Sequence, residues 1–355
     1  MNRQTLTAWL ILSRCPGIGA IKFQAIQSLW PNLSDCLAAS SKQLRQQGFT
    51  TSNVDFIKTK KHPWLDAIWP WLDNENNHLI TLEDASYPSL LKTIPDPPPV
   101  LFIRGNVSLL QKTQLAIVGA RQATPGGCNI AMRLSEDMVK NNIVITSGLA
   151  HGIDGSAHRG ALQGNGRTIA VLGTDIQTIY PKQHVNLAQT ILDNNGTIIS
   201  ETHQEMSPHP SSFPKRNRII SGLSRGTLVV EAAMRSGSLI TARLANEQNR
   251  DVFAMPGSIF NLKSRGCHHL IKQGAALVES AEDILSAWEI SHASTSPRKT
   301  RKKSPLIQHI GVEPTSFDQI CSFSQLTPPE VSAKLVELEM EGFICKTVGG
   351  YQRQE

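Results

Sequence analysis

A short, cation-rich stretch lies past the middle of the chain. Lys215, Arg216 and Arg218 fall within four residues, with Asn217 among them and Phe213 just before them. Cations neutralise backbone phosphates, and an aromatic ring offers any nucleic-acid base a face on which to stack. Taken alone, the stretch is better explained as a core phenylalanine beside a solvated charged face. What lies opposite it in the fold decides between the two interpretations.

Glycine, serine and arginine residues follow three short apolar runs elsewhere in the chain. They are Gly119 and Arg121, Ser147 and Gly148, and Ser236, Gly237 and Ser238. Glycine lets the backbone approach a ligand closely, amides at the start of a helix favour an anion, and arginine grips phosphate bidentately. In an open α/β sheet, loops of this kind meet beyond the carboxyl ends of the strands. They indicate a binding site for several consecutive phosphates more than for a single dinucleotide. Opposite such loops, the cation-rich stretch is better interpreted as part of the binding site than as a solvated face.

Motifs for cofactor binding and catalysis are absent from the sequence or stand in the wrong context. The dinucleotide fingerprint G-x-G-x-x-G is absent after the first apolar run and no ribose-binding acid is clear, so a nicotinamide cofactor is disfavoured. We expect no cofactor. Gly222–Gly226 matches the G-x-S-x-G of serine hydrolases, but it precedes an apolar run where the hydrolase serine follows one, so we reject it. His151, Asp154 and His158 have spacings that suggest a metal, yet no further ligand is evident. We predict no catalytic residue and no metal site.

Two other functions stay open at this point. The stretch Arg225–Glu231 faintly resembles the loop of nucleotide phosphoribohydrolases, although it lacks their Pro-Gly-Gly, and Glu231 can simply cap the next loop. Release of a free base from a nucleoside monophosphate would support that enzyme. A protein-interaction module would instead owe its basic cluster to an acidic partner. Strong, salt-sensitive binding to oligonucleotides of any sequence would set this alternative aside, because counterion release is a property of the polyanion.

The elements that must position these loops form a central block, residues 79–288. Apolar, β-branched runs alternate there with stretches of helical spacing, which predicts a Rossmann-like parallel sheet covered by helices on both faces. Prolines between positions 88 and 99 predict an extended lead-in to it. The predicted strands are Leu115–Val118, Ile143–Thr146, Thr168–Leu172, Thr197–Ser200, Thr227–Val230, Val252–Met255 and Ala276–Val278.

Smaller units are predicted on either side of this core. Residues 1–78 indicate a small helical domain, of helix-hairpin-helix or SAM-like type, in which Cys15–Gly19 is more simply a tight loop between two helices than a phosphate site. Residues 289–304 are a basic, Ser/Pro-rich linker, most simply a solvated connector. Residues 305–355 indicate a winged helix. Thr327 caps its second helix, Glu341-Gly342 ends that helix, and a hairpin near the C-terminus forms the wing.

Charge separates the C-terminal unit from the rest. The 355 residues carry a net charge of +6 with a pI of about 9.0, which suggests an anionic partner. The second helix of the winged-helix unit is acidic, so we expect that unit to contact protein, or nothing, more readily than DNA.

The six cysteines are scattered and form no C-x-x-C, which suits a reducing cytosol. We read no signal peptide and no membrane span, and expect a cytoplasmic protein.

Several motifs together resemble the DprA/Smf family of DNA-processing proteins. They are Tyr87–Gly105, Ile117–Arg121 (IVGAR), Ser147–Asp154 (SGLAHGID), Phe213–Ser224 (FPKRNRIISGLS), Ser236–Thr241 (SGSLIT), Ala254–Gly257 (AMPG) and Leu270–Ala275 (LIKQGA), in that order. The resemblance is dense over about 79–286 and looser at both ends. It implies a cytosolic, non-enzymatic homodimer, joined through the Rossmann-like domain. It also implies that the protein coats single-stranded DNA during natural transformation and helps to load RecA.

The resemblance also implies which residues line the DNA groove. They are Gly119, Arg121, Ser147, Gly148, Phe213, Lys215, Arg216, Asn217, Arg218, Ser236, Gly237 and Ser238. One position departs from the family pattern, because Asp175 stands where a second glycine is usual after the third strand. An acid at that place is expected to weaken a local phosphate contact while leaving the assignment intact.

Overall fold

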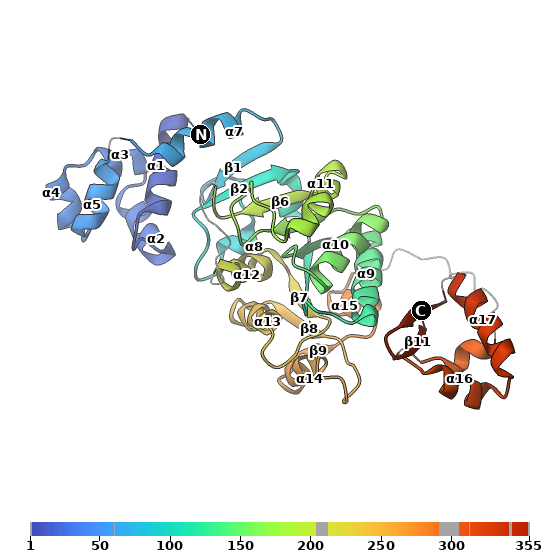
Figure 1. Ribbon diagram of the computed structural model, residues 1–355. Helices are drawn as coiled ribbons and strands as arrows, with labels where there is room; N and C mark the ends of the chain where they lie inside the picture. Colours follow the sequence, from blue (N-terminus) through green and yellow to red (C-terminus); the bar gives the residue numbers. More distant parts are fainter. Residues whose placement is uncertain are drawn as a thin grey trace.

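The computed structural model describes residues 2–59, 61–203, 212–290, 305–311, 313–340 and 343–353 (Figure 1). The N-terminal unit is a set of short helices. They are α1 (Arg3–Arg14), α2 (Ala20–Leu29), α3 (Leu33–Ala38), α4 (Ser41–Gln46), α5 (Thr51–Lys58), α6 (Pro63–Asp66) and α7 (Ile68–Leu72). Capping boxes at Ser40 and Thr50 begin α4 and α5 by satisfying amides that have no partner inside a helix. The segment between α1 and α2 is a tight turn with Gly17 at φ +73°.

A nine-stranded sheet forms the centre of the molecule, in the order β1-β2-β6-β5-β4-β3-β7-β8-β9. Strands β3 to β9 run parallel, and each predicted strand overlaps one of them. At one edge, β2 pairs antiparallel with both β6 and β1. The strands are β1 (Asn77–Thr81), β2 (Val100–Gly105), β3 (Gln114–Val118), β4 (Val144–Ser147), β5 (Thr168–Val171), β6 (Thr197–Ser200), β7 (Gly226–Val229), β8 (Asp251–Ala254) and β9 (Ala276–Leu277).

Helices cover both faces of the sheet, as the continuous apolar strands require. Along β3, Leu115 and Ile117 face one hydrophobic cluster while Ala116 and Val118 face the other, because side chains alternate along a strand. Helices α9 (Pro125–Lys140), α10 (Ile153–Gln163), α11 (Val185–Asp193) and α15 (Ala281–Ala287) lie on the first face. Helices α8 (Ser89–Lys92), α12 (Ser212–Leu223), α13 (Gly237–Glu247) and α14 (Arg265–Lys272) lie on the second. Short 3₁₀ turns, η1 (Val107–Gln111) and η2 (Lys182–His184), complete this unit.

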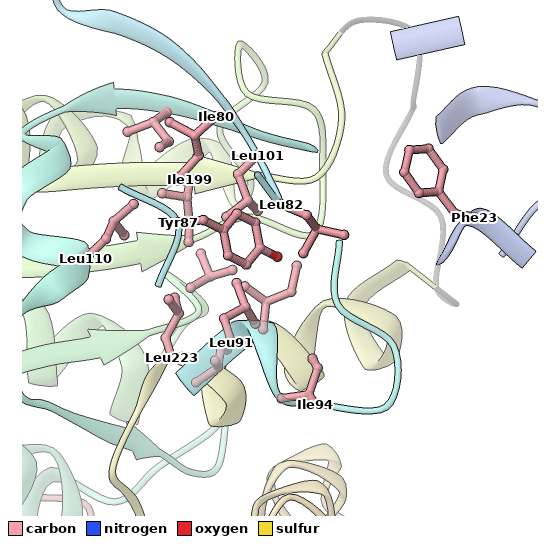
Figure 2. Close-up of a cluster of buried hydrophobic side chains, with 14 of the residues drawn as sticks. Phe23, Ile80, Leu82, Tyr87, Leu91, Ile94, Leu101, Leu110, Ile199 and Leu223 are labelled. Carbon is pink, nitrogen blue, oxygen red and sulfur yellow. The ribbon is translucent and has the colours of Figure 1, made fainter. Parts of the chain in front are cut away.

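The expectation of a wholly extended lead-in was wrong. The proline-rich segment contains α8, which begins directly after Pro88, a position where the missing N–H of proline costs nothing. Tyr87 and Leu91 pack against Leu101 of the sheet and Leu223 of α12 (Figure 2). The Tyr87 hydroxyl donates a 2.8 Å hydrogen bond to the carbonyl of Pro98. The lead-in is therefore part of the core.

The C-terminal unit is the predicted winged helix. It consists of η3 (Pro305–His309), α16 (Phe317–Ser324), α17 (Pro328–Met340), β10 (Ile344–Thr347) and β11 (Gly350–Arg353). Val331, Leu335 and Leu338 of α17 are buried against Ile320 and Ile344, which confirms the predicted apolar face. The predicted helix end at Glu341-Gly342, and most of the linker, lie outside the described residues. Within the described ranges, no helix combines the length and apolar character that a membrane span needs.

Candidate nucleic-acid groove

A groove of about 520 Å³ opens at the carboxyl edge of the sheet. Loops after β3 and β7, the beginning of α12 and the beginning of α13 surround it. It brings together many of the residues that the sequence predicted for the site. Those that line it are Gly119, Arg121, Phe213, Arg216, Asn217, Ser236, Gly237 and Ser238.

Arg216 forms the cationic floor of this groove. Its side chain is only 6% exposed, and Nη1 donates to the carbonyls of Gly148 (2.8 Å) and Val171. Nε has no hydrogen-bond partner among the described residues. Burial lowers the pKa of this guanidinium to about 10, so it stays charged at neutral pH. A buried cation whose hydrogen-bond acceptors are neutral carbonyls keeps its charge, and that charge favours an anion in the groove.

Asp154 lies beside Arg216 and holds the loop after β4. Its carboxylate accepts hydrogen bonds from the amides of Gly148 (3.1 Å) and Ala150 (3.4 Å), and so holds the loop after β4. Burial raises the pKa of this carboxyl, while Arg216 and the two amides oppose that rise. Asp154 is the one acid among the described residues that line the groove, against Arg121, Arg216, Arg235 and Lys263. The groove is therefore net cationic.

Phe213 forms one wall and supports Arg121. The guanidinium carbon of Arg121 lies 5.3 Å from the centre of the Phe213 ring, within the range of a cation–π contact. The centres of the Tyr180 and Phe213 rings lie 5.4 Å apart. A side chain at Gly173 would come within 2.7 Å of the Phe213 ring, so this glycine makes room for it. We infer that Phe213 positions Arg121, an exposed cation at the rim.

The opposite wall is the beginning of α13. Ser236 caps this helix by accepting from the amide of Ser238, and the two hydroxyl oxygens lie 2.7 Å apart. Gly237 has open space where a side chain would stand, so its backbone is accessible from the groove. Asn217 spans the two walls, because Nδ2 lies 3.4 Å from the carbonyl of Gly237. The amide end of an 11-residue helix thus faces the groove, which favours an anion there.

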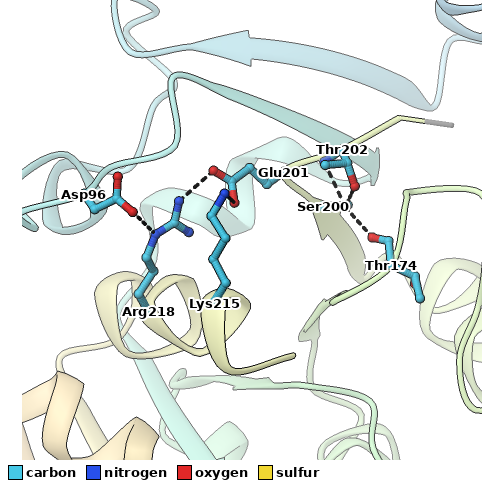
Figure 3. A network of polar contacts seen from close by, with 7 residues as sticks. All are labelled: Asp96, Thr174, Ser200, Glu201, Thr202, Lys215 and Arg218. Carbon is cyan, nitrogen blue, oxygen red and sulfur yellow. Dashed lines mark hydrogen bonds and ion pairs between the residues drawn. The ribbon is translucent and has the colours of Figure 1, made fainter. Parts of the chain in front are cut away.

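The three clustered cations divide between two sites: Arg216 lines the groove, whereas Lys215 and Arg218 both pair with Glu201. Because α12 turns by about 100° per residue, Arg216 cannot share a face with Lys215 or Arg218, whereas Lys215 and Arg218, three residues apart, can. Lys215 is exposed and pairs with Glu201 at 3.6 Å. Arg218 is buried and bridges Asp96 (2.9 Å) and Glu201 (2.6 Å) (Figure 3). Neither lines the groove, and a DNA contact by either residue stays a prediction.

Two other predicted residues hold the loops without lining the groove. Ser147 is fully buried, and its hydroxyl donates to the carbonyl of Ile117 at 2.6 Å. Gly148 packs against the Arg216 guanidinium, because a Cβ atom at position 148 would lie only 2.5 Å from it. Gly119 does line the groove, and it also lets α10 pack closely, because a Cβ would collide with Ile153.

The sequence did not reveal Arg235 and Lys263. Arg235 precedes the predicted Ser-Gly-Ser loop by one residue, and its basic charge was the available signal. Lys263 lies in the long loop after β8, where no local pattern marks it. Its backbone carbonyl accepts from the amide of Ala232 at 2.6 Å, which ties that loop to the one after β7. Both cations extend the positive edge of the groove.

Glu231 has a structural role at this edge. Its carboxylate accepts from the amide of Thr124 (2.9 Å) and from the Thr124 hydroxyl (2.5 Å), where α9 begins. Its own carbonyl accepts from the amide of Ala120 at 2.7 Å. The side chain is only 7% exposed. Both carboxylate oxygens of Glu231 are thus engaged in fixing the loop that carries Arg121.

Asp175, the departure from the family pattern, has a structural role in the turn after β5. Its Oδ1 accepts from the amides of Gln177 (2.9 Å) and Thr178 (3.0 Å), and the residue is 5% exposed. It is not among the residues that line the groove. The acid therefore stabilises the turn after β5. A weakened phosphate contact at this position stays a prediction.

The suggested metal ligands separate in the fold. His151 is exposed, Asp154 binds loop amides, and His158 is fully buried with Nδ1 2.8 Å from the Thr168 hydroxyl. That hydroxyl donates to the carbonyl of Ile145, so Nδ1 of His158 carries the proton. Among the described residues, no group of three or more His, Cys, Asp or Glu side chains is placed to hold a metal ion.

We expect His158 to make stability fall in acid. Burial lowers its pKa to about 3, whereas an unfolded histidine titrates near 6.5. The neutral ring therefore contributes stability that is fully present above about pH 6.5 and is lost as the pH falls towards 3, by up to about 1.4 kcal/mol per pH unit. Urea unfolding between pH 7 and pH 4 should show a shallower decline for His158→Gln than for the parent. The exposed His151→Gln is the control, and equal slopes for the parent and His158→Gln would contradict the assignment.

With this geometry established, comparisons with known proteins identify the family. The family model described as DNA recombination-mediator protein A matches residues 78–289, and the DprA winged helix domain model matches residues 291–350. Protein Smf of Escherichia coli (strain K12) is 42% identical over 322 residues, covering 87% of this chain and 86% of that protein. The X-ray structure of DNA processing protein A (DprA) from Streptococcus pneumoniae matches with a TM-score of 0.64 and 34% identity, over 81% of this chain and 98% of that one. A structure concerned with the unique single-stranded DNA binding mode of DNA processing protein A from Helicobacter pylori matches with a TM-score of 0.54 and 30% identity, over 60% and 96% respectively. This chain belongs to the DprA/Smf family of DNA-processing proteins.

Proposed function

We propose that this protein binds single-stranded DNA in the groove at the carboxyl edge of its sheet, with little preference for base sequence. One observation carries the proposal. Arg216 is a buried cation whose Nε faces no partner among the described residues, at the floor of a groove lined by three further cations. The family membership and the single-stranded DNA binding mode of the Helicobacter pylori relative support the same ligand.

The proposed binding begins with phosphates. One phosphate seats on Arg216 and the amide end of α13, and its neighbours meet Arg121, Arg235 and Lys263. Charge-assisted hydrogen bonds of this kind are roughly twice as strong as neutral ones. A single strand can turn its phosphates inward to reach a buried floor, whereas a duplex holds its phosphates on a stiff outer surface. We therefore expect preference for the single strand.

Low sequence preference follows from what the groove offers. Guanidinium groups, an ammonium group and backbone amides recognise phosphate, which is the same in every nucleotide. We further propose that the protein acts as a homodimer in the cytoplasm, protects the bound strand and helps to load RecA onto it. We propose no catalysis. The engagement of both Glu231 oxygens with Thr124 disfavours the phosphoribohydrolase alternative.

The first test is fluorescence anisotropy with labelled oligothymidylate and a matched duplex, titrated over a range of salt. Tight, salt-dependent binding to the single strand over the duplex supports the proposal, and RecA-loading assays follow from it. Absence of binding at moderate salt overturns it, and hydrolysis of nucleoside monophosphates would then be measured on the same protein.

Arg121→Ala should weaken binding by about tenfold for every sequence tested. The lost contact is one exposed phosphate ligand, and a charge-assisted hydrogen bond contributes about 1.5 kcal/mol or more. Because the variant releases about one counterion fewer, the slope of log affinity against log salt should flatten by about 0.7. Anisotropy on thymidylate and mixed-sequence strands checks both effects. An unchanged slope, or a loss confined to one sequence, would show that Arg121 does not bind backbone phosphate.

A further inference from the structure

The loop after β8 carries an apolar tip. Ile259, Phe260 and Leu262 are 71%, 87% and 61% exposed. Phe260 is the most exposed aromatic side chain among the described residues. Neighbouring large apolar side chains in water are unfavourable for a soluble surface and mark a contact site.

Hydrogen bonds fix this tip in place. The amide of Phe260 donates to the Ser258 hydroxyl (3.3 Å), and the amide of Lys263 donates to Oδ1 of Asn261 (3.0 Å). The carbonyl of Lys263 is bound by the amide of Ala232, in the loop after β7. The turn therefore presents Phe260 outward at a defined position beside the loop that carries Arg235.

Both the place and the charge of the loop point to a nucleic-acid strand. Strand β8 is parallel to β7, so the loop leaves the same edge of the sheet at which the groove opens. Lys263, three residues beyond Phe260, lines that groove. Between Asp251 and Glu279 the chain contains no acid, whereas it contains Lys263 and Arg265 close to the tip. An exposed aromatic ring on a chain segment that lacks acids and carries cations suits a polyanion that carries bases.

We propose that Phe260 is a stacking platform for a base of the strand that leaves the groove, with Ile259 and Leu262 as its apolar support. The inference rests on the proposed function, because the groove must first hold the backbone. The groove binds the phosphates, and the Phe260 ring stacks on a base farther along the same strand. Stacking tolerates any base, so the platform adds affinity without adding sequence preference. Its effect should appear only when the strand is long enough to reach it.

The experiment compares Phe260→Ala with the parent on short and long oligothymidylates, of about 4 and about 16 nucleotides. We expect about tenfold weaker binding of the long strand and unchanged binding of the short one. Phe323→Ala is the matched control, since it removes another exposed phenylalanine, from α16 of the winged-helix unit. A long strand with abasic sites should lose the difference between Phe260→Ala and the parent.

The outcomes separate this inference from the proposed function. If the parent binds neither strand, the proposed function fails and this inference fails with it. If the parent binds and Phe260→Ala matches it on both lengths, only the platform is overturned. Light scattering is recorded on each variant. If Phe260→Ala lowers the oligomeric mass and weakens both lengths equally, the tip is an interface between copies of the chain, and the platform is again overturned.

Discussion

Arg216→Ala is expected to weaken binding of oligothymidylate by about 100-fold. The guanidinium is buried, its Nη1 is held by the carbonyls of Gly148 and Val171, and its Nε has no hydrogen-bond partner among the described residues. Removing one partner of a buried, charge-assisted contact costs about 2–5 kcal/mol, and 100-fold corresponds to about 2.7 kcal/mol. Fluorescence anisotropy at fixed salt measures the change.

Stability must be followed in the same variant. Truncation leaves the carbonyls of Gly148 and Val171 without this donor, which costs about 1–3 kcal/mol for each buried group. Urea unfolding therefore accompanies each titration. Arg243→Ala is the matched control, because Arg243 is an exposed arginine whose one ion pair with the described residues is within its own helix, with Glu247 at 3.5 Å. If the Arg216→Ala protein is folded and its affinity for oligothymidylate is within twofold of that of the parent, Arg216 does not contribute to the binding site.

Arg216→Lys distinguishes charge from geometry. Lysine keeps a cation at the floor, but its single ammonium group cannot hold two carbonyls and also present a separate donor to the groove. We expect an affinity between those of the parent and Arg216→Ala. An affinity equal to that of the parent would show that charge alone is sufficient at this position.

The sequence predicted the sheet because buried parallel strands are continuous apolar runs. It also predicted that Gly119, Arg121 and Ser236 would meet, because loops after parallel strands share one edge. Strands β1 and β2 were missed. Prolines before Val100 obscured β2, and the pairing of β2 with β6 depends on residues almost 100 positions away. No local pattern shows such a partner.

The roles of the clustered cations were also beyond local pattern. The spacing of Arg216 and Arg218 on one helix predicts different directions, but not what each side chain meets. Arg218 meets Asp96, which lies 122 residues earlier in the chain, and Arg216 meets a carbonyl in the loop after β4. Only the folded chain shows that one arginine forms the floor of the groove while the other ties α12 to the lead-in.

Gly152→Ala is expected to lower the free energy of unfolding by about 4 kcal/mol. Gly152 has φ +71° and ψ −123°, a combination that residues with a side chain rarely adopt, and such strain costs about 1–3 kcal/mol. A Cβ there would lie 2.2 Å from the carbonyl oxygen of Ala120 and 2.7 Å from that of Arg121. Both contacts are with backbone, so the loop after β3 must move to relieve them. Urea unfolding, monitored by circular dichroism, measures the loss.

Gly48→Ala separates the two contributions to this loss. Gly48 also has a positive φ, +80°, but nothing lies within 4 Å of where its Cβ would stand. It should therefore lose only the part that comes from backbone strain, about 1–2 kcal/mol. The difference between the two variants measures the collision with the Arg121 loop. If Gly152→Ala were no more destabilised than Gly48→Ala, the loop would be free to shift, and Gly152 would not fix the position of Arg121 at the groove.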